Sequence, residues 1–356
     1  MKKEWINGMK GIAICGVVMI YCGGADLPSI LGQIGNIGKN GVQIFFLISS
    51  YLTFCSMKRA FTPDFSLSQI YKWWAKKFVK LIPLYYLALF AYAILVGGSG
   101  YWLGDQGHIT IPNMFTHIFF LHGLFPHYTN SIIGVEWYLG VLAIFYLLAP
   151  ILYKLIDRLY KAIMVWVVGT FASTVIINVA SQLVPLGTDD YIYFNYLNTF
   201  SLVAEASVLL GGIVLYFIVN EKDVKESSRA RLVTSYSLLL FALVMILGMA
   251  LNESHVFGLT DISLFGIWFF IIAVSQNIHA CKLIDNPIFK WLGKNSYPIY
   301  LFHFLFIYAY DGRIHLSTEN VVLDWFIKYI FVLCAISVTI ILFTRICNIL
   351  KKFRTA

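Results

Sequence analysis

Long apolar runs recur along this chain, and they constrain its fold more than any other feature. A helix needs about 20 mainly apolar residues to cross a bilayer, and ten runs approach that length. They cover residues 9–27, 41–57, 81–98, 136–156, 162–184, 199–219, 232–251, 260–278, 296–310 and 326–347. The first and ninth are short or rich in glycine and polar residues. The pattern predicts an all-α, polytopic transmembrane bundle of about ten spans that forms one domain over residues 1–356.

The balance of residue types excludes an ordinary soluble protein. Hydrophobic residues make up 59% of the chain and charged residues 12%, against about 25% charged in a typical soluble domain. A net charge of +8 could suggest nucleic acid, but the cations sit in short gaps between apolar runs and form no basic stripe. We therefore expect the lipid bilayer, and not nucleic acid, as the main partner.

The distribution of lysine and arginine predicts the topology. Cations concentrate in residues 58–80, 154–161, 220–231 and 279–295 and at both ends of the chain, whereas residues 97–136, 185–198 and 252–261 contain none. Cytoplasmic loops of membrane proteins carry the excess of Lys and Arg. The alternation predicts ten spans with both termini in the cytoplasm, in a multi-pass protein of a bacterial cytoplasmic membrane. Lys39 and Arg313 are the exceptions on the outer side.

Residues 99–133 form the longest segment expected outside the cytoplasm. It is aromatic and contains four histidines, His108, His117, His122 and His127. Loops of this length are often functional, so a substrate lid and a loop that merely packs on the bundle both remain open. The apolar patch Phe115–Phe125 is too short to span and is expected to be re-entrant or interfacial. Six cysteines lack metal-ligand spacing, so we expect no metal.

Placing an ionisable side chain inside a bilayer costs several kcal/mol of free energy, so each such residue requires a structural or functional explanation. Lys10 and Tyr21 lie eleven residues apart, which returns a helix to within about 20° of the same face. That face could carry a cation and a phenol for catalysis, or Lys10 could reach the headgroups while Tyr21 packs. Glu205 is expected some seven residues inside a helix, where it needs a proton or a partner.

For two further ionisable residues, Glu136 and His303, a catalytic role and a purely structural role both remain open. Glu136 opens the run at 136–156, where it could be a helix cap stabilised by the helix dipole. His303, in the run at 296–310, could be a hydrogen-bonded packing residue. Histidine is also the side chain best suited to proton transfer near neutral pH.

The basic cluster Lys76, Lys77 and Lys80 leads directly into Leu81–Tyr85. Cations at a helix mouth could hold the phosphates of a donor such as coenzyme A. They could equally be a topology signal in contact with anionic lipid.

Several segments, in order, resemble the acyltransferase 3 family of integral-membrane acyltransferases. They are Lys10–Tyr21, Gly41–Ser49, Lys77–Tyr85, Trp137–Gly140, Phe145–Leu147, Leu209–Gly212 and Leu292–His303. The resemblance implies transfer of an acyl group, commonly acetyl, from cytoplasmic acetyl-CoA to a hydroxyl of a cell-surface polysaccharide or lipid-linked glycan. It implies the positions of Lys10 and Tyr21 as the catalytic centre. Glu136 and His303 are further catalytic candidates, and the donor is expected at Lys76, Lys77, Lys80 and Tyr85. Glu205, Trp137 and His122 are expected at the acceptor.

Two departures from the family pattern bear on activity. Tyr21 stands where the family has its catalytic His, and Leu142 stands where many members carry Glu. An unperturbed Tyr, with a pKa of about 10, is a poor base at neutral pH. The alternative to an active enzyme is a catalytically degenerate relative that acts in polysaccharide export or in a synthesis complex, as a homo-oligomer or with polysaccharide-synthesis partners.

Overall fold

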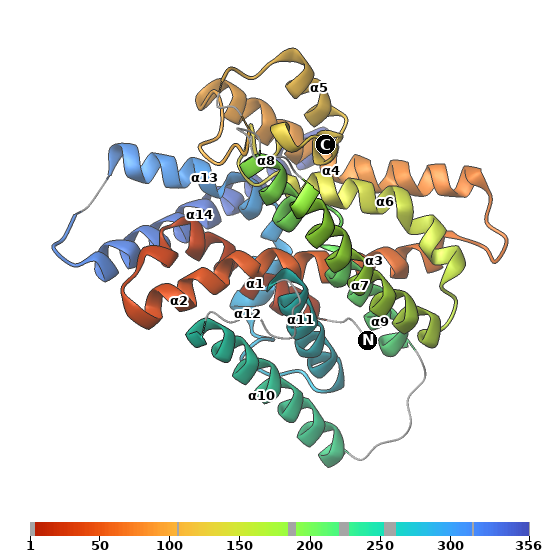
Figure 1. Cartoon of the computed structure of the whole chain (residues 1–356). Helices are drawn as coiled ribbons and strands as arrows, with labels where there is room; N and C mark the ends of the chain where they lie inside the picture. The colour runs from red at the N-terminus through yellow and green to blue at the C-terminus, as the bar shows by residue number, and fades with distance from the viewer. Residues whose placement is uncertain are drawn as a thin grey trace.

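The computed structural model describes residues 4–104, 107–183, 190–220, 228–252, 261–314 and 317–355. Within these ranges the chain is helical, and no strand occurs (Figure 1). In chain order the helices are α1 (Trp5–Tyr21), α2 (Ser29–Ile37), α3 (Gly41–Ala60), α4 (Leu67–Leu95), α5 (Ile111–Ile118), α6 (Trp137–Leu155), α7 (Leu159–Leu183), α8 (Asp190–Asn195), α9 (Ala206–Asn220), α10 (Ser228–Asn252), α11 (Asp261–Ile278), α12 (Pro287–Lys294), α13 (Ser296–Arg313) and α14 (Val321–Thr355). The predicted all-α class is confirmed for this part of the chain.

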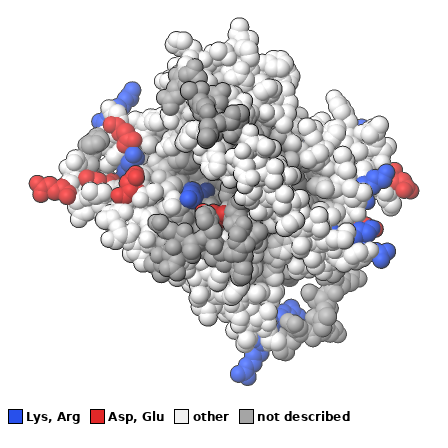
Figure 2. Space-filling model, in the orientation of Figure 1, with Lys and Arg blue, Asp and Glu red and all other residues white. Residues whose placement is uncertain are grey.

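Seven helical segments of the described chain are long and apolar enough to cross a membrane. They are Ser29–Ala60, Leu67–Leu95, Trp137–Leu155, Leu159–Leu183, Ser228–Gly248, Asp261–Ile278 and Val321–Ile349. Helices α1 and α9 are apolar but shorter. In Figure 2 most of the coloured charged side chains lie toward the left, right and lower edges of this view, with one blue and red group near the centre. The chain is therefore a multi-pass helical membrane protein, while the count of ten spans and the cytoplasmic termini stay predictions.

The backbones of α1 and α12 lie in direct contact at two glycines. A Cβ atom on Gly11 would lie 2.1 Å from the carbonyl oxygen of Phe289, and one on Gly293 would lie 1.8 Å from that of Asn7. Only glycine fits where two backbones approach so closely. α1 ends at Tyr21, because Gly23 adopts a left-handed φ of 95° just beyond the cap. The first predicted span, residues 9–27, thus starts too late and extends too far.

Helix α4 begins well before the predicted span at 81–98. Ser66 and Gln69 form a capping box, in which each side chain accepts a hydrogen bond from the other residue's backbone N–H. This arrangement satisfies the exposed donors of the first helical turn and starts the helix at Leu67. The basic residues between 67 and 80 accordingly lie on a helix and not in a loop, which corrects the sequence-based expectation.

The predicted span at 199–219 is interrupted. Residues Tyr196–Phe200 form a π-helical turn, Ser201 is extended, and α9 begins only at Ala206. The Ser201 hydroxyl accepts a hydrogen bond from the backbone N–H of Ala204, which offers the chain an alternative to a continuous helix. Glu205 therefore precedes α9, and its expected position seven residues inside a helix was wrong.

Helix α5 lies at the top of Figure 1, and its polar side chains are buried. Asn113 and His117 are fully buried, whereas Ile111, Phe115 and Phe119 are 87%, 54% and 58% exposed. No Lys, Arg, Asp or Glu occurs between residues 107 and 135. Residues 107–133 are therefore folded around buried polar groups and expose an apolar face.

Candidate active site

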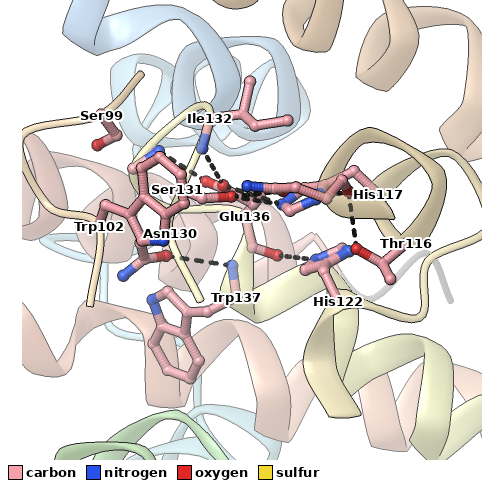
Figure 3. Close-up of polar contacts among 12 residues, drawn as sticks. Ser99, Trp102, Thr116, His117, His122, Asn130, Ser131, Ile132, Glu136 and Trp137 are labelled. Carbon is pink, nitrogen blue, oxygen red and sulfur yellow. Dashed lines mark hydrogen bonds and ion pairs between the residues drawn. The ribbon is translucent and has the colours of Figure 1, made fainter. Parts of the chain in front are cut away.

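Glu136 lies at the centre of a buried polar network just before α6 (Figure 3). Its Oε1 accepts the backbone N–H of Ile132 at 2.8 Å and lies 3.3 Å from Nε2 of His117. Its Oε2 accepts the backbone N–H of Gly134 at 2.6 Å. These donors stabilise an ionised carboxylate. Glu136 does occupy the N-cap position, as expected, but its side chain makes no capping bond to α6.

The two histidines nearest Glu136 are stacked on each other. The rings of His117 and His122 lie 4.3 Å apart at an angle of 9°, and both side chains are fully buried. Both ring nitrogens of His117 face oxygen atoms, Nδ1 toward Asn113 O at 2.9 Å and Nε2 toward Glu136 Oε1. His117 therefore links Asn113 of α5 to Glu136.

His122 is neutral in this packing. Its Nε2 lies 2.9 Å from the backbone oxygen of Glu136. Burial, together with the neighbouring His117, lowers the pKa of His122 to about 3. The residue lies inside the protein and exposes no surface to an acceptor in this conformation.

Tyr21, at the end of α1, meets His303 of α13. Their ring centroids are 5.4 Å apart. Phe304 lies 4.7 Å and Tyr101 lies 5.2 Å from the Tyr21 ring, so aromatic rings surround the phenol. Tyr21 therefore packs within the protein beside an ionisable partner.

His303 carries an unused nitrogen. Its Nδ1 lies 2.8 Å from the carbonyl oxygen of Tyr300, one turn earlier, and donates a hydrogen bond to it. That bond leaves a lone pair on Nε2, for which the described residues provide no hydrogen-bond partner. The side chain is fully buried. A neutral imidazole with one free nitrogen is the form that can accept a proton.

An inner cavity of ≈ 220 Å³ lies within the bundle beside this cluster. Lys10 and Lys77 line it together with the hydroxyl groups of Ser49, Tyr138 and Tyr300. The Lys77 amine donates to Thr53 Oγ1 at 3.3 Å and lies 4.9 Å from the ring centre of Tyr146. Tyr300 also lines the cavity and donates to the backbone oxygen of Val135 at 2.5 Å. Its ring centre lies 6.2 Å from that of His303, one turn further along α13.

The other predicted site residues are dispersed. Lys76 and Lys80 are exposed on α4 and line none of the cavities described here. Tyr85 is buried, with its ring 4.7 Å from Phe120 and its hydroxyl group without a hydrogen-bond partner among the described residues. Of the three lysines predicted to hold the donor, only Lys77 therefore lines one of the cavities described here.

Glu205 and Trp137 are also buried. Gln43 donates to Glu205 Oε1 at 3.0 Å, and Oε2 has no hydrogen-bond partner in the described part of the chain. The Trp137 ring packs on Phe46 at 5.6 Å and on Phe200 at 5.2 Å. Neither side chain is open to an acceptor in this conformation.

Sequence reasoning missed Tyr101 and Tyr300 as members of the cluster. Tyr300 belongs to the segment that carries the family resemblance, but nothing in its spacing indicates that its hydroxyl bonds to Val135. Tyr101 lies in the segment for which a lid and a packed loop were both left open, and its ring stacks on Phe304 at 4.9 Å. Among the described residues, no three His, Cys, Asp or Glu side chains gather as metal ligands would.

The fold and the buried polar cluster define a multi-pass helical membrane protein with an ionisable centre inside its bundle. The chain belongs to the acyltransferase 3 family, whose model, described as an acyltransferase domain, matches residues 3–346.

Relatives named "Putative O-acetyltransferase" in Staphylococcus aureus strains COL and MSSA476 are each 21% identical to the chain over 336 residues. The match covers 87% of this chain but 52% of each relative, so the chain spans about half the length of these relatives. No solved structure matches it.

Proposed function

We propose that this protein transfers an acyl group, in the first instance acetyl from acetyl-CoA, to a hydroxyl of a cell-surface polysaccharide or lipid-linked glycan. The observation that carries the proposal is the free Nε2 of His303 beside Tyr21. The inner cavity lined by Lys10 and Lys77 also contacts Tyr300, whose ring centre lies 6.2 Å from that of His303. The names of the bacterial relatives add support for O-acetyl transfer.

His303 acts as the general base in this scheme. Its Nε2 takes the proton of the acceptor hydroxyl as the hydroxyl oxygen attacks the thioester carbonyl. The C–S bond then breaks, and the departing thiolate receives the proton from the imidazolium, which yields the ester and free coenzyme A. Tyr300 lines the cavity one helical turn before His303, and in this scheme its ring moves aside to let the thioester reach the base.

Glu136 has a positioning role in this scheme. Its two oxygens already accept hydrogen bonds from Ile132, Gly134 and His117, which leaves it a poor proton acceptor. It ties the chain before α6 to α5. That chain includes Val135, whose carbonyl oxygen holds the Tyr300 hydroxyl.

A coupled release assay tests the proposal. Purified protein in lipid nanodiscs is mixed with acetyl-CoA and a hydroxylated glycan, and free coenzyme A thiol and glycan ester are measured. The native chain should produce both, and His303→Ala should produce neither. No release by the native chain, together with release by Tyr21→His, would favour the degenerate relative over the active enzyme.

A further inference from the structure

Three cavities adjoin one another from one end of the bundle inward. An aromatic cavity of ≈ 550 Å³ lies where α3, α6 and α9 end. It shares Lys58, Tyr216 and Asn220 with a second, basic cavity of ≈ 520 Å³. The basic cavity shares Lys10 and Leu52 with the inner cavity beside Tyr300. A long ligand can therefore occupy all three in sequence.

The aromatic cavity offers ring faces for a planar group. Phe61 and Phe65 stack at 4.5 Å, and Tyr153 lies 5.8 Å and 6.2 Å from them. All three rings line the cavity and are only half-buried. Asp157, the carboxylate on its wall, is paired with Lys161 at 2.8 Å. Half-exposed aromatic rings bind nucleobases by stacking, whatever the base.

The basic cavity carries the charge for phosphate groups. Lys10, Lys58 and Arg59 line it with the amides of Asn7 and Asn220, and no Asp or Glu stands among the described lining residues. Lys58 and Arg59 end α3, where cations also complement the helix dipole. Guanidinium and ammonium groups form charge-assisted hydrogen bonds with phosphate oxygens.

We infer that these cavities hold the nucleotide half of the acyl donor. The adenine ring lies in the aromatic cavity against Phe65 and Tyr153, and the phosphates lie at Lys58 and Arg59. The pantetheine arm extends past Lys10 into the inner cavity. The inference rests on the proposed function and names residues that the sequence analysis did not assign. It moves the phosphates from the Lys76–Lys80 cluster to the end of α3.

The walls of these cavities come from segments that the charge pattern places in the cytoplasm. Residues 58–65, 153–157 and 216–220 flank the basic gaps at 58–80, 154–161 and 220–231. In Figures 1 and 2 the end of α6 lies to the right, where Lys and Arg side chains gather. The donor would therefore enter from the predicted cytoplasmic side.

Binding measurements test the inference without catalysis. The protein is placed in phosphatidylcholine nanodiscs, and coenzyme A, ADP and pantetheine are titrated by calorimetry. Coenzyme A and ADP should bind, and pantetheine, which lacks the nucleotide, should bind far more weakly. Lys58→Ala combined with Arg59→Ala should weaken coenzyme A by about tenfold or more, because each hydrogen bond to a charged group contributes a comparable factor.

Lys76→Ala combined with Lys80→Ala is the matched control, since it removes the same charge from exposed positions on α4. It should leave coenzyme A affinity nearly unchanged. Equal weakening by both double variants would overturn the inference in favour of the Lys76–Lys80 cluster.

The aromatic cavity has its own test. Phe65→Ala should weaken ADP by about tenfold, in keeping with the stacking contribution of one base, and should leave pyrophosphate unaffected. Phe115→Ala, which removes an exposed ring of α5, serves as the control. If the basic cavity instead holds a lipid headgroup, phosphatidylglycerol will bind at Lys58 and Arg59, and coenzyme A affinity will not depend on Phe65. That result would also overturn the inference.

The two proposals fail in different ways. Coenzyme A binding that needs Lys58, Arg59 and Phe65, without any ester formed, would leave the donor site standing and remove the proposed reaction. If the protein forms the ester but its affinity for coenzyme A does not depend on these three residues, the proposed reaction stands and the proposed donor site is wrong.

Discussion

The phenol ring of Tyr21 lies 5.4 Å from the imidazole of His303, centroid to centroid, although the two residues stand near opposite ends of the sequence. α1 reaches this position because Gly8 and Gly11 let it press against the chain at Ile284 and Phe289. α13 follows α12 after a single residue, so His303 is delivered to the end of α1.

The first prediction concerns which of these two residues handles the proton. His303→Ala should reduce acyl transfer by about 10²–10⁴-fold, the usual contribution of a positioned base. Tyr21→Phe should keep most of the rate, because the ring contacts with Phe304 and Tyr101 persist. Both rates are measured as ester formation at saturating donor. A large loss with Tyr21→Phe and a small one with His303→Ala would reverse the assignment.

The buried His122 should make stability depend on pH. Its folded-state pKa of about 3 lies below the ordinary histidine pKa of 6.5, so the unfolded chain binds more protons between these pH values. Its contribution to stability is therefore present above about pH 6.5 and declines on acidification, by at most about 1.4 kcal/mol per pH unit. Denaturant unfolding in detergent should show that the free energy of unfolding falls less steeply below pH 6.5 (the acid limb of the pH profile) for His122→Gln than for the native chain.

His108→Gln is the control for that measurement, because it alters an exposed histidine of the same segment. It should leave the acid limb as in the native chain. If the His108 variant flattens the limb and the His122 variant does not, the buried histidine is not the source of the acid sensitivity.

Close contact between α1 and α12 predicts a steep cost for adding one methyl group. Gly11→Ala should lower the free energy of unfolding by about 1–3 kcal/mol or more, because the new Cβ would meet the Phe289 backbone. Gly248→Ala, in α10, has nothing within 4 Å of the added atom and should be neutral or stabilising. Equal melting temperatures for the two variants would contradict this packing.

The outward apolar face of α5 should contact lipid. Spin labels at Ile111, Phe115 and Phe119 should be reached by oxygen, which partitions into the bilayer, and shielded from a water-soluble nickel reagent. A label at Lys72, exposed on α4 in the predicted cytoplasmic part, should show the opposite preference. Strong nickel access at all three α5 positions would place the segment in water.

The charge pattern predicts that both ends of the chain lie in the cytoplasm. Reporter fusions before Trp5 and after the end of α14 should therefore give cytoplasmic signals. A periplasmic signal at one end would leave an odd number of spans and reverse the side assigned to part of the loops. The proposed donor entrance at Lys58 depends on this orientation.

Helix content and the shared face of Lys10 and Tyr21 could be predicted because both depend on nearby residues. An apolar run of sufficient length becomes a helix in lipid, since every backbone group must be hydrogen-bonded within it. The exact ends were less predictable. The Ser66–Gln69 capping box lengthened α4, and the Ser201 bond interrupted the run before Glu205.

The candidate site depended on tertiary contacts that no local pattern encodes. The sequence left Glu136 open as a cap of α6 or as a catalytic group. Its carboxylate in fact lies 3.3 Å from His117, which α5 brings back into the bundle. The lysines at 76, 77 and 80 look alike in the sequence, but only Lys77 faces inward on α4.

The sequence by itself determined that this chain forms apolar helices, and its ordered motifs indicated the family. Bilayer partition is a sum over neighbouring residues, so it can be read along the chain. Only the tertiary structure decided that Tyr21 meets His303 and that Lys58 and Arg59 share a cavity with Lys10. Such meetings depend on how helices pack at small residues and through polar contacts, because lipid supplies no hydrophobic drive that would select one helix partner over another.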